Sequence, residues 1–235
     1  MPNEHHIHVR RTARYYTLGE PGPETRDIWF VCHGYGQSAA EFIREFEVIA
    51  DPARVIVAPE ALSRYYVPTG PGFHTAEAKV VASWMTREDR EAEIDDYVAY
   101  LDALYAEILA RTDRKDVSIT VLGFSQGGAT ANRWITRGRA RAQRLIMWGA
   151  LLATDADLNQ AAAFFRDVKL MIVSGKRDRL ASQGMIEDYQ KLLSEKGIPF
   201  EVVTFEGGHR MDRETLMMLA ATERRTTPEE RMPVA

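Results

Sequence analysis

A serine flanked by glycines is the feature of this sequence with the clearest chemical potential. Residues 123–127 read Gly-Phe-Ser-Gln-Gly, which is a G-x-S-x-G motif. The motif follows a β-branched apolar run at 117–122 and precedes a helix-like run that ends near Arg137, so it has the strand–turn–helix setting of a nucleophilic serine. A phosphate-binding glycine turn is the alternative, but neither a Walker lysine nor a G-x-G-x-x-G pattern follows. We therefore predict that Ser125 is a catalytic nucleophile.

A serine hydroxyl needs a base, and His209 is the best candidate. His209 follows the apolar run 200–205, and a candidate orienting acid, Asp178, follows the run 168–173. Because the carboxyl ends of parallel strands meet at one edge of a sheet, these side chains are expected near Ser125, in the chain order Ser, Asp, His. Asp155 and Asp157 are the alternatives to Asp178. The other histidines are His5, His6, His8, His33 and His74.

An acyl-transfer site also needs donors for the oxyanion that forms on the substrate. The sequence His-Gly-Tyr-Gly at 33–36 follows the apolar run 27–32, and its glycines allow backbone N–H groups to turn toward the site. The predicted oxyanion donors are the backbone N–H groups of Tyr35 and of Gln126, the residue after the nucleophile. His33 is expected to be structural. Cys32 lies within the predicted strand and is expected to be buried and inert. A catalytic pair of Cys32 and His33 is not expected, because adjacent strand residues point to opposite faces.

Apolar runs and helical patterns alternate along the chain that must position these groups. This alternation predicts an α/β fold with a mostly parallel twisted sheet and helices on both faces, in a single domain over 1–221 with a polar tail at 222–235. A pattern resembling a capping box at 86–89 predicts that the longest helix begins near Thr86. The predicted strands are 27–32, 54–58, 117–122, 144–148, 168–173 and 200–205, with 8–16 as a candidate edge strand, and the other predicted helices are 38–49, 127–137, 182–195 and 213–220.

The composition excludes several other classes of protein. One cysteine among 235 residues excludes a disulfide framework and a Cys-rich zinc site. A net charge of −4 argues against broad binding to nucleic acid or anionic lipid. No stretch approaches the roughly 20 apolar residues of a membrane span, and the N-terminus lacks a signal-peptide pattern, so a cytoplasmic protein is expected. No metal or other cofactor is expected, since the histidines at 5, 6 and 8 have no acidic partner at ligand spacing and are interpreted as a surface cluster.

The segment from Ala61 to Met85 is predicted to be a long loop without periodicity. Loops of this length are usually functional, and its aromatic residues argue against disorder. We interpret these side chains as the apolar lining for an acyl or aryl group of the substrate. The alternative is that these aromatic side chains only pack the loop against the body of the protein. The candidate substrate-binding residues are Tyr65, Tyr66, Phe73, Trp84 and Met85.

From about Trp29 to His209 the sequence resembles the phospholipase/carboxylesterase family of small α/β-hydrolases, which includes acyl-protein thioesterases. The motifs that carry the resemblance are Gly-Phe-Ser-Gln-Gly-Gly at 123–128, His-Gly-Tyr-Gly at 33–36 and Gly-x-x-Asp at 175–178. The resemblance implies an α/β-hydrolase fold, the triad Ser125, Asp178 and His209, and the oxyanion donors at Tyr35 and Gln126. Gln37 and the pair Leu180-Ala181 depart from the family pattern.

These features together predict a metal-independent serine esterase that acts on a small-molecule ester through an acyl-enzyme. Thioesterase, lysophospholipase or peptidase activity would use the same chemistry. A non-catalytic ligand-binding protein on a hydrolase scaffold is the alternative of a different class, and a homodimer stays open. A dienelactone-type hydrolase would usually carry a cysteine at the elbow, where Ser125 stands.

Overall fold

The computed structural model describes residues 2–67, 78–112, 117–151 and 162–221. Its main feature is a seven-stranded sheet in the order β1-β3-β2-β6-β7-β8-β9. All neighbouring strands in this sheet run parallel except the edge pair β1 and β3. The strands of the sheet are β1 (Tyr15–Leu18), β2 (Asp27–Cys32), β3 (Arg54–Pro59), β6 (Ser118–Phe124), β7 (Arg144–Trp148), β8 (Lys169–Gly175) and β9 (Glu201–Phe205).

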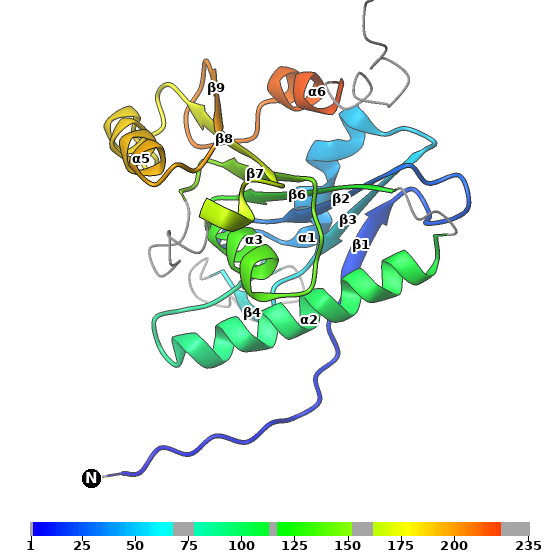
Figure 1. Ribbon diagram of the computed structural model, residues 1–235. Coiled ribbons are helices and arrows are strands. Elements are labelled where there is room, and N and C mark those ends of the chain that lie inside the picture. Colours follow the sequence, from blue (N-terminus) through cyan, green and yellow to red (C-terminus); the bar gives the residue numbers. More distant parts are fainter. Residues whose placement is uncertain (1, 68–77, 113–116, 152–161, 222–235) are drawn as a thin grey trace, which may run out of the picture.

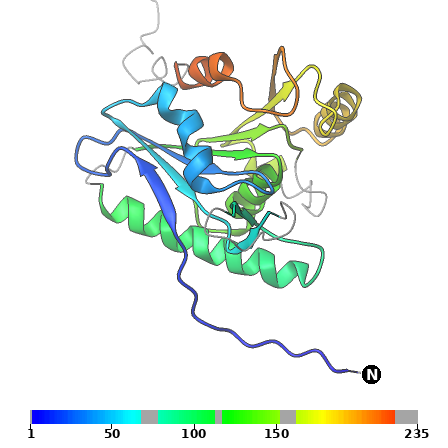
Figure 2. The same ribbon diagram turned by 180° about the vertical axis from the view of Figure 1, so that it is seen from behind.

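Helices cover both faces of this sheet, so the fold has three layers (Figures 1 and 2). Buried residues of α2, α3 and α5 share one apolar cluster with one face of the strands. Buried residues of α1, η1 and α6 share a second cluster with the other face. The predicted α/β architecture is therefore confirmed. The helices are α1 (Ala39–Phe42), the 3₁₀ helix η1 (Ile43–Ile49), α2 (Arg90–Ala110), α3 (Gln126–Arg137), α5 (Gln183–Glu195) and α6 (Arg213–Ala221).

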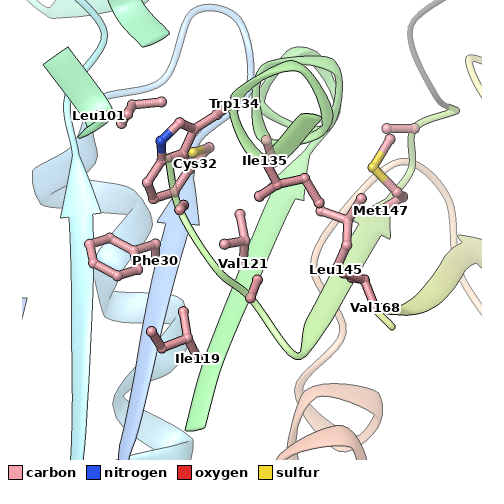
Figure 3. Packing of buried hydrophobic residues seen from close by; sticks show 14 of the residues in the cluster. Phe30, Cys32, Leu101, Ile119, Val121, Trp134, Ile135, Leu145, Met147 and Val168 are labelled. Atoms are coloured by element: carbon pink, nitrogen blue, oxygen red, sulfur yellow. The ribbon is translucent and has the colours of Figure 1, made fainter. Parts of the chain in front are cut away.

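Strand β2 illustrates why the core has two halves. Successive side chains of a strand point to opposite faces, so Phe30 and Cys32 join the α2–α3 cluster while Trp29 and Val31 join the other. Figure 3 shows Trp134 of α3 over this face of β2, and its ring meets the Phe30 ring edge-on with centroids 5.3 Å apart. Burial on both faces explains why these strands are continuous apolar runs rather than alternating ones.

Two predicted element starts are wrong, and the helix expected at 38–49 is instead a short α-helix followed by the 3₁₀ helix η1. The edge strand expected at 8–16 begins only at Tyr15, which pairs with Pro59, the last residue of β3, so the ladder has no further partner strand. The longest helix begins at Arg90 rather than near Thr86, because Asp89 adopts a left-handed conformation (φ 47°). Thr86 does not cap this helix; its backbone N–H instead donates to Oε2 of Glu93 at 2.5 Å.

A small hairpin-like sheet replaces part of the long loop expected between Ala61 and Met85. Strand β4 (Ser63–Tyr66) pairs antiparallel with β5 (Val80–Ser83). Residues 68–77 between them, and the predicted tail 222–235, lie outside the described residues. Among the helices that the structure describes, none is long and apolar enough to cross a membrane.

Candidate active site

Ser125 occupies a sharp turn between β6 and α3. Its backbone has φ 53° and ψ −119°, a conformation that a non-glycine residue adopts only under strain. The backbone N–H of Ser125 donates to the carbonyl of Trp148 at the end of β7, at 2.9 Å. The strained turn is therefore held by the neighbouring strand, as expected of a nucleophile elbow.

The glycines on either side of Ser125 are required by close backbone approach. A Cβ at Gly123 would lie 2.1 Å from the carbonyl oxygen of Gly127. A Cβ at Gly127 would lie 2.2 Å from the carbonyl oxygen of Cys32 on β2. Both distances are far below any real Cβ contact, so the motif residues at these places have a steric explanation that is independent of any catalytic role.

Asp178 and His209 meet beyond the carboxyl ends of β8 and β9. The Oδ2 atom of Asp178 lies 2.8 Å from Nδ1 of His209. The carboxylate is almost fully buried, at 1% side-chain exposure, whereas the imidazole is 20% exposed. The second carboxylate oxygen, Oδ1, accepts hydrogen bonds from the backbone N–H groups of Leu180 at 2.8 Å and Ala181 at 3.0 Å. Asp178 does not cap α5, because Ser182 is the N-cap of that helix.

His209 also lies close to the elbow. Its ring packs against that of Phe124, the residue directly before Ser125, with centroids 4.9 Å apart. Gly149 follows Trp148, the residue that anchors the Ser125 N–H, and a Cβ at Gly149 would lie 3.0 Å from Cε1 of His209. The serine, the histidine and the aspartate therefore converge at one edge of the sheet. The alternative acids Asp155 and Asp157 lie outside the described residues.

Gly149 is a residue of this site that the sequence reasoning missed. Its φ is +57°, a conformation suited to glycine. The available signal was a glycine directly after the predicted strand 144–148. That signal became meaningful only when the sheet order placed β7 between β6 and β8.

The predicted oxyanion donors lie on the loop after β2 and at the start of α3. Neither the Tyr35 nor the Gln126 backbone N–H has a hydrogen-bond acceptor within the described parts of the chain. Gln126 is the first residue of α3, where helix N–H groups lack an intrahelical partner. Gly36, with φ 71°, follows Tyr35 and donates its N–H to the carbonyl of Ala82 at 3.0 Å.

His33 is fully buried, and among the described residues its ring forms hydrogen bonds only with backbone groups. Its Nε2 accepts the N–H of Ala61 at 3.1 Å, so Nδ1 carries the proton and donates to the carbonyl of Gly34 at 2.8 Å. Burial lowers the pKa of His33 and keeps the ring neutral. This geometry agrees with the structural role expected for His33. Burial likewise raises the pKa of the Cys32 thiol, so this sulfur stays protonated and inert.

The candidate substrate-binding residues have different surroundings. Trp84 is 2% exposed, its indole N–H donates to the carbonyl of His33 at 2.8 Å, and its ring meets that of Tyr97 edge-on. These contacts favour the packing alternative for Trp84. Tyr66 is 44% exposed, while Tyr65 and Met85 are half-buried. Phe73 lies outside the described residues.

Tyr65 contacts the loop after β2 that carries Tyr35, one of the predicted oxyanion donors. Its ring lies 5.8 Å from that of Tyr35, between centroids, and a Cβ at Gly36 would lie 3.5 Å from its hydroxyl. Burial, together with a hydrogen bond to Tyr35, raises the pKa of Tyr65 to about 12. Tyr65 is therefore a neutral hydroxyl beside the site.

His6 lies beside two carboxylates, Glu4 and Asp89, and these three residues together could hold a metal ion. Nε2 of His6 lies 3.3 Å from Oε1 of Glu4 and 3.1 Å from Oδ2 of Asp89. All three residues are exposed. The expectation that the N-terminal histidines lack an acidic partner is therefore wrong for His6. Glu4 is its near neighbour in the sequence, and the fold brings the remote Asp89 to it. This cluster is separate from the Asp178–His209 pair.

The model of one protein family matches residues 18–223, which is most of the chain. The chain belongs to the phospholipase/carboxylesterase family. This family consists of esterases, including carboxylesterases and thioesterases. The resemblance inferred from the motifs at 123–128, 33–36 and 175–178 is thus confirmed.

Solved structures of a thioesterase, an esterase and a carboxylesterase have the same fold as this chain. Acyl-protein thioesterase 2 of Zea mays is 17% identical, with a TM-score of 0.66 over 91% of this chain and 98% of that one. Esterase PE8 is 20% identical, with a TM-score of 0.64 over 91% and 99%. A carboxylesterase from Mesorhizobium loti is 16% identical, with a TM-score of 0.65 over 91% and 95%. At these identities the likeness shows the fold alone. No curated protein matches the sequence.

Proposed function

We propose that this member of the phospholipase/carboxylesterase family is a serine carboxylic-ester hydrolase. The observation that supports this most strongly is the 2.8 Å contact between Asp178 and His209, next to a serine in a strained elbow. A buried carboxylate on one imidazole nitrogen leaves the other nitrogen free to act as a base. A ligand-binding scaffold alone would not require this arrangement.

In the proposed reaction, Ser125 Oγ attacks the ester carbonyl carbon while Nε2 of His209 takes the hydroxyl proton. The carbonyl oxygen becomes an oxyanion, which accepts hydrogen bonds from the backbone N–H groups of Tyr35 and Gln126. Collapse of the tetrahedral intermediate breaks the bond to the alcohol oxygen, which receives the proton from His209. An acyl-serine remains.

Water then attacks the acyl-serine, with His209 again taking a proton. The second tetrahedral intermediate releases the carboxylic acid and returns the proton to Ser125. Asp178 holds the imidazole in the tautomer with Nδ1 protonated and stabilises the imidazolium in both steps. No step of this mechanism uses a metal or an organic cofactor.

The experiment that tests this function is hydrolysis of p-nitrophenyl esters from acetate to long acyl chains, with Ser125→Ala as the control. A matched series of acyl thioesters, measured with a thiol reagent, tests the thioesterase alternative. We expect turnover of esters by the wild type, unchanged by EDTA, and at least about a 10³-fold loss in Ser125→Ala. Tight ligand binding without turnover would instead support the ligand-binding scaffold.

A further inference from the structure

The side chain of Gln126 joins the nucleophile helix to a distant segment of the chain. Oε1 of Gln126 accepts the backbone N–H of Trp84 at 3.1 Å. Nε2 donates to the carbonyl of Met85 at 2.8 Å. The hydroxyl of Ser83 lies within 3.4 Å of Oε1 and 3.3 Å of Nε2. The amide therefore uses both its acceptor and its donor on the segment Ser83–Met85, which we term the strap.

The same strap and the adjoining residue of β5 hold the loop that carries Tyr35. The indole N–H of Trp84 donates to the carbonyl of His33 at 2.8 Å. Ala82 accepts the N–H of Gly36 at 3.0 Å and donates its own N–H to Gln37 at 2.9 Å. The Trp84 indole thus reaches the loop before Tyr35, and the backbone of Ala82 reaches it after Tyr35.

This arrangement matters because the two proposed oxyanion donors come from different elements. Strands β2 and β6 are paired only as far as Cys32 and Gly123, so sheet hydrogen bonds end before either donor. Tyr35 is 63% exposed, and burial does not hold it in place. Preorganised donors stabilise an oxyanion only when their spacing is already correct before the reaction.

We propose that the Gln126 side-chain amide is a positioning group that fixes the spacing between the two oxyanion donors by bonding the start of α3 to the strap. The inference rests on the proposed serine-esterase function. The Gln126 backbone N–H is the donor, and the side chain acts through the geometry of that donor and of Tyr35. A glutamine suits this place because the strap presents one N–H group and one carbonyl to it.

The test compares Gln126→Met, which keeps the length of the side chain but loses both hydrogen bonds, with Gln143→Met as the matched control. Gln143 also accepts a backbone N–H, that of Ile119 at 2.7 Å, but it lies next to the start of β7, at the opposite end of the strands. For each protein, kcat and KM are measured on a p-nitrophenyl ester. The affinity for a trifluoromethyl ketone, which forms an oxyanion when Ser125 adds to it, is measured in parallel.

We expect Gln126→Met to lower kcat about 10- to 100-fold with KM changed less than about 3-fold, which is a smaller loss than removal of an entire oxyanion donor. The affinity for the trifluoromethyl ketone should fall in step with kcat/KM. Gln143→Met should keep both quantities within about 2-fold of the wild type. A kcat for Gln126→Met within 3-fold of that control would overturn the proposal.

Gln126→Glu provides a second test that survives if Gln126→Met folds poorly. The introduced carboxylate can still accept the Trp84 N–H, but it faces the Met85 carbonyl without a proton to donate. Protonation restores that donor, so the ratio of mutant to wild-type kcat should rise as the pH is lowered. A ratio that does not change with pH would overturn the proposal. If the wild type neither hydrolyses esters nor reacts at Ser125, the proposed function fails together with this inference.

Discussion

The two carboxylate oxygens of Asp178 have different hydrogen-bond partners: one faces His209, and the other accepts two backbone N–H groups. Oδ2 faces Nδ1 of His209 at 2.8 Å, while Oδ1 accepts the backbone N–H groups of Leu180 and Ala181. The two N–H groups fix the orientation of the carboxylate plane. The side that faces His209 is therefore determined by the turn after β8 and does not depend on the imidazole.

This asymmetry gives a prediction for Asp178→Asn. The amide oxygen should take the place of Oδ1, because only an acceptor suits the Leu180 and Ala181 N–H groups. The NH₂ group then faces Nδ1 of His209 and stabilises the tautomer with Nε2 protonated, which cannot accept the serine proton. We expect kcat to fall about 10⁴-fold with the Tm little changed. Asp155→Asn and Asp157→Asn serve as controls. A larger loss of kcat in either of them would show that the acid follows β7 in the sequence and is not Asp178.

The backbone strain at Ser125 separates catalytic loss from stability. Ser125→Ala keeps a Cβ at φ 53°, whereas Ser125→Gly removes it. Both variants should lose at least about 10³-fold in kcat. The glycine variant should have a free energy of unfolding about 1 kcal/mol higher than the alanine variant, because the strain is relieved. Urea unfolding measures this difference, and equal stabilities would argue that the elbow is unstrained in solution.

Several parts of this fold could be predicted because local pattern and tertiary structure agree. The buried strands are apolar runs bounded by Gly, Pro or Asp, so β2 and β7 were predicted with their observed limits. The start of α2 could not be predicted, because the left-handed Asp89 and the Thr86–Glu93 contact replace a local cap. The hairpin of β4 and β5 was missed, since its strands are short and their pairing is not visible in local periodicity.

In the candidate site too, some residues could be predicted from the sequence and others could not. Ser125, Asp178 and His209 each follow a strand, and the parallel sheet brings strand ends together without further information. The Gln126 contacts with Trp84 and Met85 span more than 40 residues of sequence. No local signal distinguishes a glutamine that bonds to a remote backbone from one that faces solvent. The role of its side chain was therefore invisible, although its backbone N–H was predicted as a donor.

Acid should weaken the fold through His33. Burial lowers the pKa of His33, so the unfolded chain takes up the proton first, and the free energy of unfolding should fall as the pH drops below about 6.5. Each unit by which the pKa is lowered corresponds to about 1.4 kcal/mol. Above that pH this contribution is constant. Urea unfolding of the wild type and His33→Gln between pH 5 and 8 tests this, and we expect a shallower loss in the variant. Equal slopes would contradict it.

Trp84 and Tyr66 should respond differently to truncation. Trp84→Ala removes a buried indole and should cost about 3–5 kcal/mol of stability, with similar fractional losses of kcat/KM on short and long esters. Tyr66 is 44% exposed, so Tyr66→Ala should change the ratio of kcat/KM between long and short acyl esters while the Tm stays nearly constant. Because apolar pockets discriminate by about 1–3 kcal/mol per methylene, the change should be graded. A selective loss on long esters in Trp84→Ala would reverse these assignments.

Labelling with a fluorophosphonate, followed by mass spectrometry of the intact protein and of its peptides, tests directly whether Ser125 is the nucleophile. This reagent reacts with a serine that a neighbouring base has activated. We expect one equivalent of label, located on the peptide that contains Ser125, with labelling lost in Ser125→Ala and strongly slowed in Asp178→Asn. An unlabelled wild type, or a Ser125→Ala variant that is labelled as fast as the wild type, would contradict the assignment of Ser125 as the nucleophile.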